Sequence, residues 1–168
     1  MGKRTITFGL NEKDLNRAIR ELEEYRKEFL RKCNELIRQL TERGEEVAKL
    51  FVVELGAFDT GNLHDSIHGY FDPDVGVGFI RAECWYAVYV EYGTGVVGAN
   101  ARHPLAADHG WVYDINHHGD NGWVYFSAHD GQCQFHHTKG QPSSPFMYST
   151  FRFLQQRARD IARTVFNG

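Results

Sequence analysis

Apolar side chains recur at steps of three and four residues over the first third of the chain. This spacing is typical of one face of an amphipathic helix. Asn11 precedes the series and predicts an N-terminal cap, because its side chain can accept a hydrogen bond from the backbone N–H groups of the first turn. The pattern predicts a helical region over residues 11–55, with its apolar face formed by Leu15, Ile19, Leu22, Phe29, Cys33, Leu36, Leu40, Val47, Phe51 and Leu55.

The length of this region leaves two interpretations open. As one helix, residues 11–55 would extend roughly 65 Å, which is too long for a compact domain of this size. Gly44 lies inside the region, and a glycine costs about 1 kcal/mol relative to alanine within a helix. We therefore expect either a kink or break near Gly44, or an unbroken helix that projects and packs on a neighbouring molecule.

Two short alternating runs follow within residues 60–94. Residues 66–71 and 75–83 flank Asp72-Pro73-Asp74, whose composition is typical of a turn. We expect the two runs to pair as an antiparallel hairpin.

A compact apolar and aromatic segment over residues 86–93 ends this region. Its spacing predicts a helix of about two turns that stops at Gly93. Glu91 is the single acid in it, and a buried acid needs a partner. Backbone N–H groups, Arg81 and Arg102 are the candidates, and we expect Glu91 to hold either the Thr60–Ser66 segment or the Gly93–Gly95 loop.

Residues 95–144 combine a loop of small residues with repeated aromatic runs. Trp111-Val112-Tyr113 recurs as Trp123-Val124-Tyr125, and a third alternating run follows Asp130-Gly131, a dipeptide that favours hairpin turns. We predict a three-stranded antiparallel meander with strands near 111–115, 123–128 and 132–137. Aromatic side chains are enriched at protein interfaces, so the candidate partner surface consists of Trp111, Tyr113, Trp123 and Tyr125.

The last segment predicts a second amphipathic helix, over residues 145–166. Ser144 and Pro145 suit the cap and the first helical position. The apolar face that follows contains Met147, Phe151, Leu154, Ala158, Ile161 and Val165. Taken together, the elements predict a single α+β domain over residues 1–168: a small antiparallel sheet, a long N-terminal helix, a C-terminal amphipathic helix and an inserted β-meander.

Charge is distributed unevenly along the chain. The formal net charge is −3, but residues 51–140 contain 3 basic and 11 acidic side chains, and all nine histidines lie there. An acidic centre disfavours sequence-specific nucleic-acid binding, because phosphate contacts require Lys and Arg. The three cysteines (Cys33, Cys84 and Cys133) form no CxxC pair and no apolar run is long enough for a membrane span, so we expect a cytoplasmic protein without disulfides or membrane contact.

The histidines raise the question of a metal site. His117-His118 and His136-His137 are adjacent pairs, but neighbours in a strand point to opposite faces. No HExxH or other recognised ligand spacing is present. Ser66 lacks a G-x-S-x-G context, and Cys84 lies in apolar surroundings where a thiol is usually inert. We expect no catalytic residue, no metal and no cofactor, with a small metal-dependent hydrolase as the alternative.

Three motifs resemble the tail-completion, or head–tail joining, proteins of tailed bacteriophages. That family has a "TGNL-x-x-SI" element, a "YA-x-x-VE-x-GT" element and a "PF" that opens a C-terminal helix. The three motifs follow one another in the same order here and span most of the chain. The matching residues are Gly61, Asn62, Leu63 and Ser66; Tyr86, Ala87, Val90, Glu91, Gly93 and Thr94; and Pro145 and Phe146.

The resemblance implies a virion structural protein that joins head and tail, or completes the tail, at the neck. It implies a homo-oligomeric ring, with six subunits as the family's most plausible number, that contacts other neck, tail or connector proteins. DNA would pass through this ring without sequence-specific binding. A tail terminator and a head-side connector are related alternatives. Family members usually connect "GT" to "PF" with less material, so residues 95–144 are expected to be an insertion.

Overall fold

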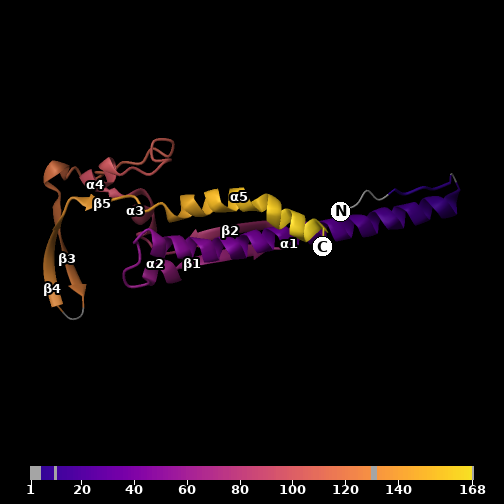
Figure 1. The fold of residues 1–168 in the computed structure, drawn as a ribbon, viewed down its shortest axis with the longest axis horizontal. Helices are drawn as coiled ribbons and strands as arrows, with labels where there is room; N and C mark the ends of the chain where they lie inside the picture. Colours follow the sequence, from indigo (N-terminus) through magenta and orange to yellow (C-terminus); the bar gives the residue numbers. More distant parts are fainter. Residues whose placement is uncertain (1–4, 10, 130–131, 168) are drawn as a thin grey trace.

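The first predicted helix is a single continuous element. In the computed structural model, which describes residues 5–9, 11–129 and 132–167, helix α1 extends over Glu12–Glu54 and contains 43 residues. Oδ1 of Asn11 accepts a hydrogen bond from the backbone N–H of Asp14 at 2.9 Å, which confirms the predicted cap. The N-terminal part of α1 extends well beyond the rest of the molecule (Figure 1). Helix α1 is therefore unbroken and projects, while its packing on a neighbouring molecule stays a prediction.

The expectation of a break at Gly44 is wrong, and the packing of α1 explains why. Gly44 is buried where α1 crosses strand β2 and helix α5. A Cβ atom at this position would overlap Cδ1 of Ile80 and lie 3.0 Å from Cδ1 of Leu154. The glycine therefore allows close packing of α1 on two neighbours, which compensates for its low helix propensity.

The predicted hairpin is confirmed. Strands β1 (Ile67–Asp72) and β2 (Val77–Ala82) pair antiparallel, with Tyr70 opposite Phe79. A short helix, α2 (Asn62–Asp65), leads into β1. One face of the hairpin lies against α1, where a Cβ atom at Gly78 would overlap Oγ1 of Thr41.

Helix α5 (Phe146–Asn167) lies antiparallel beside α1, and these two elements make the most extensive contact among the described parts of the chain. The ring centroids of Phe29 and Phe166 are 5.8 Å apart near the end of α5. The helix begins one residue after the predicted Pro145, whose carbonyl oxygen accepts a hydrogen bond from Ser149 N at 2.9 Å. Two long helices with small antiparallel sheets make this an α+β fold, as the sequence predicts.

The predicted meander is a two-stranded hairpin. Strands β3 (Trp123–His129) and β4 (Gln132–Thr138) pair antiparallel, with Phe126 opposite Phe135. The hairpin lies at the end of the molecule opposite to the start of α1 (Figure 1). The Asp130-Gly131 dipeptide that suggested a turn lies outside the described residues.

The predicted strand at 111–115 is wrong. The carboxylate of Asp114 accepts hydrogen bonds from the backbone N–H groups of His118 and Gly119, each at 2.8 Å. This side-chain-to-backbone bonding favours turns over strands, and a 3₁₀ turn follows at Gly119–Asn121. The three remaining short elements are α3 (Ala87–Tyr92), α4 (Gly95–Asn100) and β5 (Gly140–Gln141).

Candidate functional site

The three motif segments meet in the core, although they are far apart in the sequence. Each contributes to one cluster of buried apolar side chains at the end of α1 opposite the projecting segment. Leu63 comes from α2, Ala87 from α3 and Phe146 from α5. The cluster consists of Ala48, Val52, Leu63, Ile67, Ala87 and Phe146. These motif positions therefore hold separate elements together by packing.

Glu91 is the polar centre of this arrangement. It is 7% exposed, and its carboxylate accepts hydrogen bonds from the backbone N–H groups of Met147 and Tyr148, each at 2.9 Å. These are orphan donors of the first turn of α5, where the helix dipole also favours a negative charge. Glu91 therefore connects α3 to the start of α5.

His103 completes the contacts of Glu91. Its Nδ1 atom accepts a hydrogen bond from Leu105 N at 3.0 Å, which assigns the ring proton to Nε2. Nε2 then donates to Oε1 of Glu91 over 3.1 Å, and His103 is 4% exposed. Burial, and secondarily the negative charge of Glu91, raises the pKa of neighbouring Tyr92.

The predicted partners of Glu91 are partly corrected. Backbone N–H groups, one of the three expected kinds of partner, do bind Glu91. They belong to α5, so the expectation that Glu91 holds the Thr60–Ser66 segment or the Gly93–Gly95 loop is wrong. Arg102 instead donates from Nε to the carbonyl oxygen of Ala99 at 2.8 Å. The sequence did not predict His103 as a partner of Glu91, because the contact forms only when the loop over residues 101–106 folds back onto α3. No sequence spacing indicates such a contact.

The "GT" segment joins the strand that leads into α5. Thr94 and Gln141 form an antiparallel bridge, and so do Gly95 and Gly140. Oγ of Ser143 donates to the carbonyl oxygen of Glu91 at 2.6 Å. A Cβ atom on Gly93 would lie 2.9 Å from the carbonyl oxygen of Gln141, and its φ of 78° favours glycine. Gly93 therefore ends α3, as predicted, and permits this close approach.

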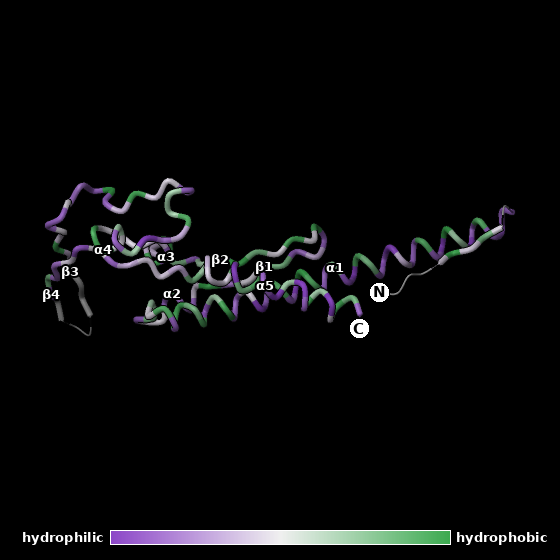
Figure 2. The backbone as a smooth tube through the Cα atoms, turned by 45° about the horizontal axis from the view of Figure 1, so that its top comes forward, coloured by the Kyte–Doolittle hydropathy of each residue, from purple (hydrophilic) through white to green (hydrophobic). Residues whose placement is uncertain are grey.

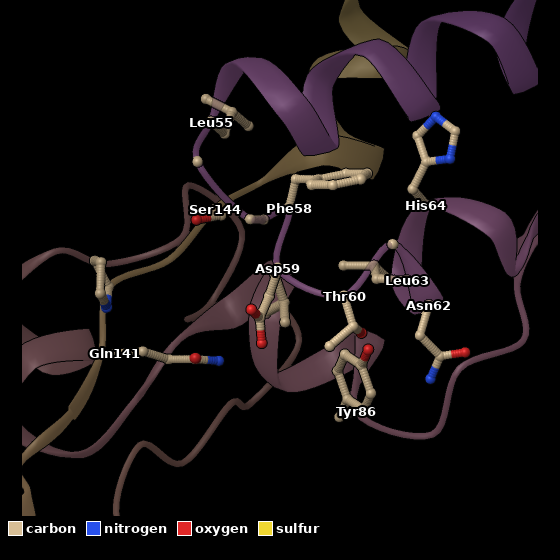
Figure 3. A pocket seen from close by; sticks show the side chains of 15 residues that line it. Leu55, Phe58, Asp59, Thr60, Asn62, Leu63, His64, Tyr86, Gln141 and Ser144 are labelled. Atoms are coloured by element: carbon tan, nitrogen blue, oxygen red, sulfur yellow. The ribbon is translucent and has the colours of Figure 1, made fainter. Parts of the chain in front are cut away.

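A pocket of about 500 Å³ opens beside the motif core (Figure 3). Phe58 and Asp59 line it from the loop after α1, Tyr86 lines it from the start of α3, and Gln141 lines it from β5. Motif residues Gly61, Asn62, Leu63 and Val90 also contribute. Burial, followed by hydrogen bonding with Cys84, raises the pKa of Tyr86. Among the described residues that line the pocket, no hydroxyl group is hydrogen-bonded to a histidine or a carboxylate.

The remaining motif residue of this region, Ser66, has a local role. Its Oγ donates to the carbonyl oxygen of Leu63 at 2.8 Å, which closes α2 just before β1 begins. Among the motif positions, Ser66 and Glu91 thus act through hydrogen bonds, whereas Leu63, Ala87 and Phe146 act through burial.

The four aromatic residues proposed for a partner surface differ in exposure. Trp111 is half-buried and stacks on Tyr92, with the ring centroids 4.8 Å apart. Its Nε1 donates a hydrogen bond to the carbonyl oxygen of Gly93 at 3.0 Å. Tyr113 accepts a hydrogen bond from His103 N at 3.2 Å, and Trp123 stacks on His118 at 4.8 Å. Tyr125 is exposed. Internal contacts therefore occupy much of the first three side chains.

The histidines are dispersed over the fold. His64 lies in α2, where its Nδ1 atom is 2.7 Å from Oδ1 of Asp65, whereas His68 lies in β1. Within the described residues, no group of three or more His, Cys, Asp or Glu side chains has the geometry to hold a metal ion. No helix of that part of the chain combines the length and apolar character needed to cross a membrane.

Comparison with known proteins identified no matching family model, no similar curated protein and no similar solved structure. The likeness to phage tail-completion proteins therefore remains a prediction from the three motifs.

Proposed function

We propose that this protein is a structural subunit of a tailed phage, which assembles with itself into a ring and joins head and tail at the neck. Two features support a structural role. The motif residues pack the core or fix α5. The molecule is elongated (Figure 1), with exposed apolar side chains on the start of α1 and on the β3–β4 hairpin. The motif resemblance supports the location at the neck.

The projecting start of α1 is the observation that carries self-assembly. Leu15, Ile19 and Leu22 are 48%, 45% and 56% exposed and lie on one side of the helix. A contiguous stripe of exposed apolar side chains marks an interaction surface, because fully burying each leucine or isoleucine contributes about 1.5–3 kcal/mol to the free energy of association. The long helix thus provides more apolar surface than one chain covers.

The acidic middle of the chain suits a DNA passage. Residues 51–140 have a formal charge of −8, with 3 basic and 11 acidic side chains and neutral histidines. A channel lined by these residues would repel the phosphate backbone and let DNA slide. A channel lined by Arg152, Arg159 and Arg163 of α5 would contradict this part of the proposal.

Deletion of the gene from the viral genome tests the function. The proposal predicts lysates that contain DNA-filled heads and complete tails but few joined particles. Adding the purified protein should restore joined, infectious virions. Joined particles in the deletion lysate would contradict the proposal. Tails of uncontrolled length would instead identify a tail terminator, and heads that lose their DNA would identify a head-side connector.

A further inference from the structure

The apolar side of α1 continues as one regular seam past the end of α5. Its positions alternate between steps of four and three residues, which is the heptad spacing of coiled coils. The seam consists of Leu15, Ile19, Leu22, Arg26, Phe29, Cys33, Leu36 and Leu40. The apolar face of α5 follows the same alternation, from Met147 to Val165. The two helices therefore present matching seams to each other.

Helix α5 covers only part of the α1 seam. Leu36 and Leu40 are half-buried, and Val47 is 3% exposed, in the stretch that lies beside α5. The contact ends near Phe29, whose ring meets Phe166, and Lys32 donates to the carbonyl oxygen of Phe166 at 3.3 Å. Before Phe29 helix α5 no longer covers the seam, and Leu15, Ile19 and Leu22 are 48%, 45% and 56% exposed. Residues 5–9 run back beside the start of α1 (Figure 1), and Ala18, outside the seam, is buried. Figure 2 shows apolar and polar positions alternating along this stretch. We call residues 12–29 the arm.

We propose that the arm pairs with the arm of a second copy of this chain as an antiparallel two-helix coiled coil. This inference rests on the proposed self-assembly and names the partner of the exposed stripe. The heptad pattern indicates what covers the arm: a helix with the same seam spacing, running antiparallel as α5 does along the rest of α1. The arm itself has that seam.

Charge within the seam selects the antiparallel direction. Antiparallel pairing centred on Ile19 and Leu22 places Leu15 opposite Arg26 of the partner subunit, and Phe29 opposite Glu12 of the partner subunit. Arg26 then lies one layer from Glu12 of the partner subunit, and opposite charges meet twice. Parallel pairing in register would place Arg26 against Arg26 of the partner subunit, which is unfavourable.

The extent of the paired segment also fits the fold. With this centre, the overlap ends at Phe29, where α5 begins to cover α1. The arm pair and the α1–α5 contact would therefore meet at Phe29 and form one continuous helical layer. An assembly linked in this way contains an even number of subunits.

A charge exchange tests the pairing on the full chain by sedimentation equilibrium. Arg26→Glu and Glu12→Arg should each raise the dissociation constant of the dimer about tenfold or more, because each places like charges in neighbouring layers. The double variant should recover wild-type affinity. Arg20→Glu, which makes the same charge change outside the seam, is the matched control and should leave the affinity unchanged.

Cysteine cross-linking tests the direction independently. In a background with Cys33, Cys84 and Cys133 replaced by serine, chains with Ile19→Cys mixed with chains with Leu22→Cys should oxidise to the mixed dimer. Efficient homodimer formation by Ile19→Cys alone would indicate a parallel pair and overturn the proposal.

The two proposals fail separately. A chain that assembles but does not recover affinity in the double variant overturns arm pairing and leaves the proposed function standing. A wild-type chain that stays monomeric at its highest soluble concentration also overturns arm pairing. Head–tail joining by the purified protein, measured in the deletion lysate, then decides the proposed function by itself.

Discussion

Oε1 of Glu91 lies 3.1 Å from Nε2 of His103, and both side chains are almost completely buried. The same carboxylate accepts two backbone N–H groups from the first turn of α5. One acid therefore satisfies donors from a loop and from a helix end, and it fixes α5 relative to α3. A residue of the "VE" motif, which could suggest chemistry, has a structural role here.

Glu91→Gln should destabilise the protein by about 2–4 kcal/mol. The amide carries an N–H₂ group in place of one acceptor oxygen, so at least one buried donor loses its partner, and the negative charge at the start of α5 is lost. Chemical denaturation with far-UV circular dichroism measures the change. Glu54→Gln, at an exposed position, is the control and should change stability little. Equal midpoints for the two variants would mean that Glu91 does not fix α5.

The close approach of α1 to the hairpin gives a second prediction. Gly78→Ala should cost about 1–3 kcal/mol, because the new methyl group would overlap Oγ1 of Thr41. The Thr41 hydroxyl donates to the carbonyl oxygen of Ile37 at 2.9 Å and cannot turn away freely. Adding Thr41→Ala should recover part of the loss, since it removes the clashing atoms. Additive losses in the double variant would argue against this contact.

Glu45 gives a pH-dependent prediction. Its hydrogen bond with Lys49, and secondarily the one from Gly69 N, holds its pKa below the ordinary value of 4.5. A lowered folded-state pKa adds stability above pH 4.5 that is lost as the pH falls through the folded-state value. The difference in urea midpoint between wild type and Glu45→Gln should therefore be largest near neutral pH and shrink below pH 4.5. A difference that stays constant over this range would contradict the assignment.

The β3–β4 hairpin should be dispensable for folding. Its strands contact each other far more than they contact other elements. Trp123 and Thr138 are Cα partners at its base, so Asn-Gly in place of residues 124–137 would close it as a two-residue turn. We expect the shortened chain to keep the wild-type thermal midpoint. A large decrease would show that the hairpin supports the core.

Periodicity predicted the helices and the first hairpin well, because each depends on local spacing. Leu15 to Leu55 and Met147 to Val165 repeat on one face, and the turn at Asp72-Pro73-Asp74 separates two strands. The break expected at Gly44 failed for a non-local reason. Helix propensity describes an isolated helix, whereas Gly44 is buried against Ile80 and Leu154.

The site was less predictable than the fold. The motifs pointed to Glu91 and to a buried partner, but the partner's identity depends on how the 101–106 loop returns to α3. In the same way, Trp111 belongs to an alternating apolar run, yet its indole N–H donates to the carbonyl oxygen of Gly93. The carboxylate of Asp114 accepts a hydrogen bond from His118 N and caps a turn nearby. Such side-chain-to-backbone contacts replace a strand that alternation alone predicts.

The molar mass of the purified protein, measured by light scattering over a concentration series, tests the central claim of self-assembly most directly. A single chain has a mass of 19.3 kDa. The account predicts a closed oligomer whose mass is a whole-number multiple of this value and stops increasing with concentration. A mass of 19.3 kDa at every concentration would contradict it.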